Sequence, residues 1–132
     1  MRLFCDLDGV LVLQTGRDNF DKMPWMPDGN VLWQFLAPRK PTILSMLRPD
    51  IYERCAPQKR AWCARELGPT VPVIIARQQY GKDALAAAHP GAILIDDDPT
   101  THRHGWQKAG GTFIHHLGAE YTIAQLRQLG VN

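Results

Sequence analysis

Two aspartates near the start of the chain, Asp6 and Asp8, flank a single leucine in the stretch RLFCDLDGVLV. Apolar residues precede them and a glycine follows, so the pair lies where a buried strand is expected to end. A second acidic group, Asp96 to Asp98, follows another apolar run, AILI. Like charges that converge in a low-dielectric setting repel each other strongly, and a cation relieves this repulsion. The acids therefore indicate a cation site, if the fold brings them together.

The residue types favour Mg²⁺ as that cation. Mg²⁺ prefers a few carboxylates together with water and phosphate oxygens. The acids lack clustered cysteines, and the two nearby histidines are expected on the surface or at a helix cap, so Zn²⁺ suits the acids less well.

The elements that must position these acids alternate along the chain. Short apolar runs bounded by Gly, Pro or Asp predict strands of a parallel sheet, at 2–5, 41–45, 71–76, 92–95 and, more weakly, 111–116. Helical patterns lie between them, at 28–37, 57–68, 81–89, 99–110 and 121–130. This alternation predicts an α/β fold, a three-layer doubly wound (Rossmann-like) and mostly parallel sheet of about five strands, in a single domain over 1–132. In such sheets ligands bind beyond the carboxyl ends of the strands, where the acids gather.

The bulk composition is that of an ordinary globular protein. Of its 132 residues, 45% are hydrophobic and 21% charged, and a net charge of +2 argues against a strongly basic nucleic-acid coat protein. Three cysteines without metal-ligand spacing indicate reduced thiols. The sequence offers no apolar run of membrane-spanning length and no signal-peptide pattern, so we expect a cytoplasmic protein with no membrane partner.

Four elements in order resemble the haloacid dehalogenase-like superfamily, whose usual members are Mg²⁺-dependent phosphohydrolases. They are DLDGVL after a first strand, a strand ending in Ser45, a later lysine, and ILIDDD after another strand. The resemblance covers nearly the whole chain. It implies that Asp6 is a nucleophile forming an aspartyl-phosphate, and that Asp8 is the general acid and then the general base. It also implies that Ser45 and Lys82 bind the phosphoryl group.

The same resemblance implies the metal ligands. Mg²⁺ would be bound by Asp6, by the main-chain carbonyl of Asp8, and by Asp96 or Asp97. The sequence leaves open which of these two is the ligand and which orients Lys82 or a metal-bound water. The third acid, Asp98, precedes a proline and is best interpreted as a helix cap.

General chemistry is consistent with these roles. A carboxylate is a known covalent acceptor of phosphoryl groups. Phosphoryl transfer needs in-line positioning and positive charge around the phosphate oxygens rather than much covalent help. A bend at Gly9 would place Asp6 and Asp8 on either side of one phosphate.

Two of the assignments have competitors. Lys59 competes with Lys82, but it lies in a predicted helix and is expected to be a solvated charge. Thr42 competes with Ser45, but it begins its strand and so is expected at the opposite edge of the sheet. A pair of histidines, His102 and His104, flanks the second acidic group; we expect them on the surface or at a helix cap rather than in proton transfer.

The substrate is harder to infer. The stretch between Asp8 and Ser45 leaves only 11–27 as a flap, too short for the cap domain that closes many related phosphatases. The site is therefore expected to be open, unless a second subunit of a homodimer covers it. An open site suits a nucleotide or other phosphorylated small molecule, and also a phosphorylated polynucleotide end.

Two sequence features favour nucleotides modestly. The stretch 38–65 is rich in basic residues, which suit a polyanion, and Trp25 in the flap could stack on a base. The common alternatives are a solvated helix face and a tryptophan that fixes a loop to the core. The segments TILSMLRPDIYERCAPQKRAWCARELG, YGKDALA, LIDDD and AGGTFIHH are similar to the 5′(3′)-deoxyribonucleotidase branch of the superfamily, although those enzymes carry a helical cap for which this chain has no room.

The function expected from the sequence is thus Mg²⁺-dependent hydrolysis of a phosphomonoester through an aspartyl-phosphate. A polynucleotide-end phosphatase is the alternative within this chemistry. A non-hydrolytic phospho-acceptor module similar to a response-regulator receiver, or a binding domain that merely retains the scaffold, is the alternative outside it.

Overall fold

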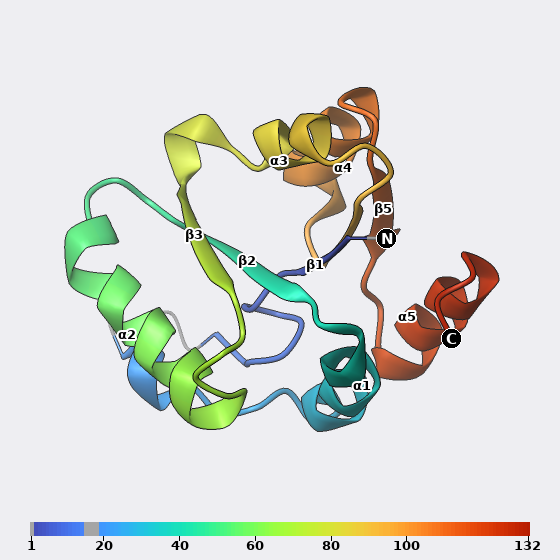
Figure 1. Cartoon of the computed structure of the whole chain (residues 1–132). Helices are drawn as coiled ribbons and strands as arrows, with labels where there is room; N and C mark the ends of the chain where they lie inside the picture. Colours follow the sequence, from blue (N-terminus) through green and yellow to red (C-terminus); the bar gives the residue numbers. More distant parts are fainter. Residues whose placement is uncertain (1, 15–18) are drawn as a thin grey trace.

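The computed structural model describes residues 2–14 and 19–132, and its centre is one parallel sheet of five strands. The strand order is β3-β2-β1-β4-β5 (Figure 1). The strands are β1 (Leu3–Cys5), β2 (Thr42–Leu47), β3 (Val73–Arg77), β4 (Ile93–Asp96) and β5 (Thr112–His115). From β1 the chain adds β2 and β3 on one side and then β4 and β5 on the other. The strand order therefore changes direction between β1 and β4, and a ligand-binding crevice is expected there, at the carboxyl ends of the strands. The predicted α/β Rossmann-like fold is confirmed.

Helices cover both faces of the sheet (Figure 1). They are α1 (Gly29–Leu36), α2 (Tyr52–Glu66), α3 (Asp83–Ala88), α4 (Pro99–Lys108) and α5 (Ala119–Gln128), with 3₁₀ turns η1 (Phe20–Lys22), η2 (Ala37–Arg39) and η3 (Gln78–Tyr80). Because side chains alternate along a strand, Leu3 and Cys5 of β1 pack with α1, α2 and α5, whereas Phe4 packs with α3 and α4. This gives the three layers of a doubly wound domain.

Helix α2 begins earlier than its sequence suggests. The expectation that Pro57 opens this helix is wrong, because the helix starts at Tyr52 and contains the proline. A proline inside a helix removes one backbone hydrogen bond. The buried face of α2, with Cys55, Trp62 and Cys63 packed in the core, supplies the compensating stabilisation.

Two aspartates cap helices, and one of them caps a helix that is distant from it in the sequence. Asp98 caps α4 as predicted, since its Oδ1 accepts from the backbone N–H groups of Thr100 and Thr101 at 3.1 Å each. Asp28 is the first residue of the predicted helix 28–37, but its side chain makes no such bond at the start of α1. Instead, Asp28 Oδ2 accepts from the backbone N–H of Ala119 at 2.6 Å, at the start of α5. Its partner is distant in sequence, which is why local pattern did not reveal it.

The remaining global expectations concern thiols and membranes. Cys5, Cys55 and Cys63 are all free and buried. Burial raises the pKa of the Cys63 thiol to about 11, so it stays protonated at neutral pH. No helix in the described ranges has the length and apolar character needed to cross a bilayer.

Candidate active site

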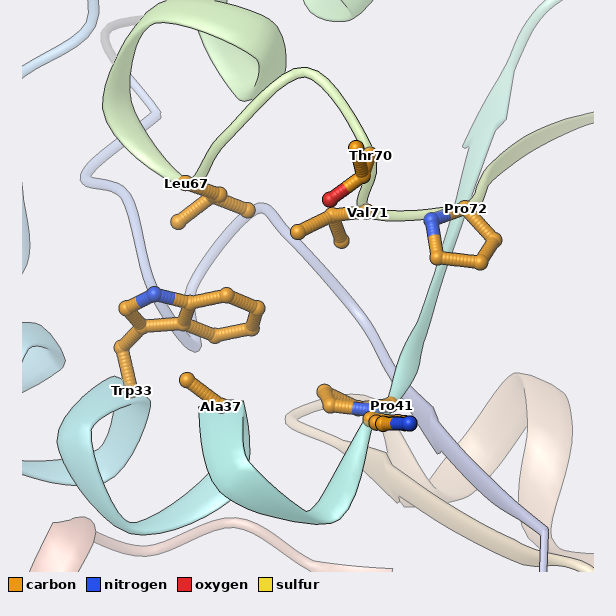
Figure 2. A pocket seen from close by; sticks show the side chains of 8 residues that line it. Trp33, Ala37, Pro41, Leu67, Thr70, Val71 and Pro72 are labelled. Atoms are coloured by element: carbon orange, nitrogen blue, oxygen red, sulfur yellow. The ribbon is translucent and has the colours of Figure 1, made fainter.

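One hollow lies at the amino edge of the sheet, away from the predicted site residues. It measures about 530 Å³, and its lining is mainly apolar, with Trp33, Leu67 and Val71 among the side chains (Figure 2). Pro41 and Pro72, which precede β2 and β3, place it at the strand starts. None of the predicted site residues lies in its wall.

The predicted carboxylates meet at the opposite, carboxyl edge. Strands β1 and β4 are paired in parallel with Cys5 beside Ile95, and the backbone N–H of Asp6 donates to the Ile95 carbonyl at 2.9 Å. This register sets Asp6 next to Asp96, the last residue of β4. Oxygens of Asp6, Asp96 and Asp97 all lie within 4.8 Å of one another. These three residues form a set that fits a hard divalent cation.

Lys82 is the counter-charge of this acidic cluster. It is the N-cap residue of α3, is only 2% exposed, and donates from Nζ to Asp96 Oδ2 at 2.8 Å and to Asp6 Oδ1 at 3.3 Å. Although burial lowers the pKa of Lys82, the charges of Asp6 and Asp96 raise it overall, so the lysine is a fixed cation. The structure thus places Lys82 where the sequence predicted it.

The two members of the Asp-Asp pair differ in how they are engaged. Both oxygens of Asp96 have partners, because Oδ2 accepts from Lys82 and Oδ1 accepts from the backbone N–H of Asp98 at 2.9 Å. Asp97 is exposed to solvent, whereas Asp96 is buried, and the Asp97 carboxylate lies against Gly9. A Cβ on Gly9 would come within 1.9 Å of Asp97 Oδ2, and Gly9 has a φ of +78°, which explains why a glycine is needed here.

Burial and mutual repulsion make this cluster electrostatically unfavourable on its own. Burial raises the pKa of Asp6 well above its usual value; Lys82 lowers it, and the charges of Asp96, Asp8 and Asp97 raise it further. Burial and Asp96 likewise raise the pKa of Asp97. One lysine does not neutralise three carboxylates, so a bound divalent cation would stabilise their charged forms.

Asp8 belongs to a second ion pair, and here one prediction is wrong. Lys59 was expected to be a solvated charge, but it is 1% exposed. Its Nζ donates to Asp8 Oδ2 at 2.6 Å, to Ser45 Oγ at 2.7 Å and to the Met46 carbonyl at 3.0 Å. Ser45 lies within β2 rather than at its end, since the strand continues to Leu47.

A helical-spacing signal for Lys59 was present in the sequence. Cys55, Trp62 and Cys63 lie four before, three after and four after this lysine, so all four residues share one face of α2. That face packs against the sheet. A lysine among apolar residues on the buried face of a helix is expected to have a partner.

The hollow at this edge is small. It measures about 240 Å³ and is lined by Asp6, Asp8, Gln14, Met46, Lys82, Asp96, Asp97, Asp98 and His102. His102 was expected on the surface or at a cap, but it is buried, and its Nε2 is 3.9 Å from Asp96 Oδ2. Burial, aided by the charge of Lys82, lowers the pKa of His102. His104 is exposed, as expected.

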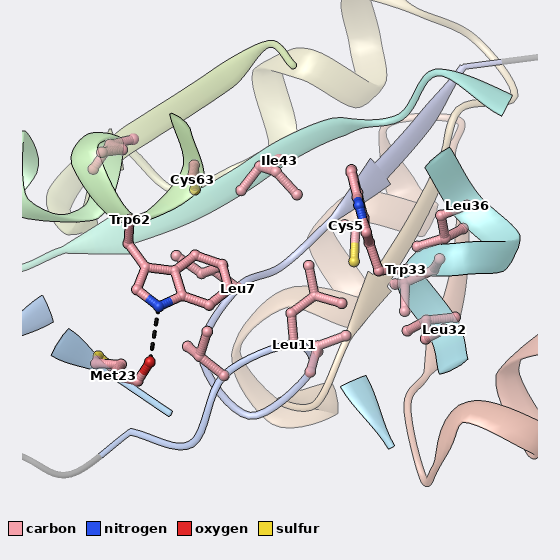
Figure 3. Close-up of a cluster of buried hydrophobic side chains, with 14 of the residues drawn as sticks. Cys5, Leu7, Leu11, Met23, Leu32, Trp33, Leu36, Ile43, Trp62 and Cys63 are labelled. Atoms are coloured by element: carbon pink, nitrogen blue, oxygen red, sulfur yellow. Dashed lines mark hydrogen bonds between the residues drawn. The ribbon is translucent and has the colours of Figure 1, made fainter. Parts of the chain in front are cut away.

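Within the described part of the flap 11–27, Gln14 lines the hollow, whereas Met23 and Trp25 pack onto α2. Met23 is buried, and its carbonyl accepts from Trp62 Nε1 at 2.8 Å (Figure 3). Trp25 contacts the Trp62 ring with centroids 5.1 Å apart and donates to Glu66 at 3.1 Å. Of the two roles considered for Trp25, the structure therefore supports fixing the flap to the helix rather than stacking on a base. Residues 15–18 of the flap lie outside the described residues.

Three basic side chains of the stretch 38–65 are engaged within the fold. Arg39 bonds the Phe35 carbonyl, Arg60 donates to the Val73 carbonyl at 2.8 Å, and Lys59 is buried at the site. These three side chains therefore do not support binding of a polyanion along the stretch.

Comparison with known proteins identifies the fold. No family model matches the chain, and no curated protein sequence is a significant match. The solved structures that are similar in fold include two D,D-heptose 1,7-bisphosphate phosphatases. The protein from B. bronchiseptica, whose structure was determined with magnesium and phosphate, has 14% identity and a TM-score of 0.61 over 98% of this chain and 99% of its own. That from Burkholderia thailandensis has 12% identity and a TM-score of 0.50, over 95% and 99%.

At these identities the likeness establishes the fold alone. It agrees with the resemblance to haloacid dehalogenase-like phosphohydrolases at the level of architecture. The narrower resemblance to deoxyribonucleotidases gains no support, since both neighbours are sugar bisphosphate phosphatases.

Proposed function

We propose that this protein is a Mg²⁺-dependent phosphomonoester hydrolase that works through an aspartyl-phosphate on Asp6. The observation that carries the proposal is the position of Asp6, whose carboxylate lies within 4.8 Å of the Asp96 and Asp97 oxygens and 3.3 Å from the Lys82 ammonium. A nucleophilic carboxylate beside a cation site and a fixed ammonium has what phosphoryl transfer requires.

The donor set fits Mg²⁺, and the structure favours one of the two candidate ligands. Asp6, Asp97 and the main-chain carbonyl of Asp8 would hold the ion. Asp96 is the less suitable ligand, because both of its oxygens already accept hydrogen bonds. We therefore assign Asp96 to the orientation of Lys82. When bound, Mg²⁺ supplies positive charge that offsets the charge of the phosphoryl oxygens.

The chain's own residues perform the bond changes. An Asp6 oxygen forms a bond to phosphorus as the bond from phosphorus to the leaving oxygen breaks, and Asp8 gives its proton to that oxygen. Water then attacks the phosphorus, its proton passes to Asp8, and the bond between Asp6 and phosphorus breaks. Lys82, which lines the hollow, holds phosphoryl oxygens through hydrogen bonds and charge. Ser45 is 1% exposed and lies outside that lining, so the role that the resemblance implies for it gains no support from the structure.

The size of the hollow indicates how much of a substrate it holds. At about 240 Å³ it is smaller than sites that enclose a whole small-molecule ligand. We infer that it takes the phosphoryl group and leaves the rest of the substrate at the rim. A phosphorylated small molecule, such as a sugar phosphate or a nucleotide, is the substrate class we propose. The phosphatase fold of the neighbours is consistent with either.

A panel of phosphate esters tests this proposal. Purified protein with Mg²⁺ is expected to release phosphate from p-nitrophenyl phosphate, and more efficiently from at least one sugar phosphate or nucleoside 5′- or 3′-monophosphate. EDTA should abolish release and excess Mg²⁺ should restore it, because the acidic cluster lacks sufficient counter-charge without the ion. A 3′-phosphorylated oligonucleotide and a phosphopeptide serve as large-substrate comparisons.

Two results would contradict the proposal. Phosphate release unaffected by EDTA would exclude the metal-assisted mechanism. No turnover of any ester, with a long-lived phosphoryl group on the protein, would instead indicate a phospho-acceptor module.

A further inference from the structure

Lys59 has no role in the mechanism so far, yet it is among the most completely buried charges of the protein. Its ammonium makes three hydrogen bonds, to Asp8, Ser45 and the Met46 carbonyl, and lies 4.9 Å from the centroid of the Phe20 ring. Burial of a charge is costly unless the charge is paired and fully hydrogen-bonded, as it is here.

The bonds of Lys59 join two parts of the site that the backbone does not connect. Asp8 lies in a tight loop after β1, in which the backbone N–H of Gly9 donates to the Val12 carbonyl at 2.8 Å. Ser45 lies on β2. A single ammonium on α2 contacts both side chains and so fixes their separation.

The two oxygens of the Asp8 carboxylate have different surroundings. Oδ2 is held by Lys59, whereas Oδ1 is buried and has no hydrogen-bond partner within residues 2–14 and 19–132. A buried polar atom without a partner is rare and costs free energy. Asp8 also lines the hollow, so its carboxyl group borders the space that a substrate group would occupy.

We propose that Lys59 is a positioning residue that holds Asp8 by Oδ2 and Ser45 by Oγ, so that the Asp8 carboxyl stays where it exchanges a proton with the leaving oxygen of the substrate. This inference rests on the proposed phosphatase function. The two buried lysines then have separate tasks: Lys82 serves the nucleophile Asp6, and Lys59 serves the proton donor Asp8. A proton donor displaced by even about 1 Å can lose on the order of 10²-fold in rate.

A leaving-group series on Lys59→Met tests the proposal. Esters with poor leaving groups, such as glycerol phosphate, need the proton and should lose on the order of 10²-fold in kcat. p-Nitrophenyl phosphate needs little protonation and should lose less than about 3-fold, because the nucleophile and Lys82 are untouched. Lys108→Met, at an exposed position on α4, is the matched control and should leave both rates unchanged.

A double-mutant cycle separates positioning from a general structural effect. In an Asp8→Asn background, Lys59→Met should add little further loss on glycerol phosphate, since the residue it positions no longer donates a proton. Circular dichroism checks that each variant folds. If Lys59→Met does not fold, Lys59→Arg is scored in the same way, because its longer, planar head group keeps the charge but shifts the contact atoms.

Equal losses on both esters, or losses that multiply in the double variant, would overturn the inference while leaving the proposed function intact. An inactive parent protein would overturn both.

Discussion

Replacing Asp6 by asparagine is expected to abolish phosphate release, with a loss of at least about 10³-fold in kcat on every ester that the parent protein hydrolyses. An amide oxygen does not form the phosphoryl-enzyme bond. The fold should survive, because asparagine has nearly the same shape and removes one charge from a cluster in which burial raises the pKa of Asp6. Steady-state kinetics and a thermal melt of the same sample measure both effects.

Two controls make this result interpretable. Asp50→Asn makes the same chemical change at an exposed position and should retain full activity. Intact-mass measurement checks that the new asparagine has not deamidated back to aspartate. Undiminished activity in a verified Asp6→Asn sample would exclude Asp6 as the nucleophile.

Replacing Lys82 by methionine is expected to cost both activity and stability. The substitution leaves Asp6 and Asp96 buried without their ammonium, and breaking a buried ion pair in this way typically costs about 3–5 kcal/mol. Activity should fall as well, because the phosphoryl oxygens lose a fixed positive charge. Urea denaturation without divalent metal gives the free energy of unfolding, and adding Mg²⁺ should recover part of the loss.

The stability loss in Lys82→Met should depend on pH with a defined sign. Lys82 lowers the pKa of Asp6, so its removal raises that pKa further. A carboxyl whose pKa is higher in the folded than in the unfolded state destabilises the fold once pH rises above its unfolded value, and the loss is recovered as pH falls through the folded value. The deficit relative to the parent should therefore be larger at pH 7 than at pH 5. Lys40→Met, at an exposed position, is the control. An equal deficit at both pH values would contradict this electrostatic origin.

The sequence predicts the sheet and the acidic cluster because both follow from short-range pattern. Apolar runs mark the strands, and parallel pairing then forces Asp6 and Asp96 to one edge whatever the details of the loops. Lys82 is implied by the resemblance, whose pattern expects a lysine between β3 and β4. These inferences need only the order of the elements.

What the sequence does not predict depends on contacts between distant segments. Lys59 meets Asp8 across 51 positions of sequence, so its charge alone suggested a solvated side chain. Asp28 caps a helix whose first residue is 91 positions away. Trp25 has an ordinary packing partner in Trp62 that no local spacing reveals. In each case a side chain with several plausible partners is assigned only by the folded structure.

The most direct test of the central claim is a crystal structure of the protein with Mg²⁺ and beryllium fluoride, which mimics a phosphoryl group on a carboxylate. The account predicts a beryllium fluoride group on an Asp6 oxygen, with Mg²⁺ bound by Asp6, Asp97 and the Asp8 carbonyl, and with Lys82 against the fluorides. An empty hollow, or the mimic on another residue, would contradict it.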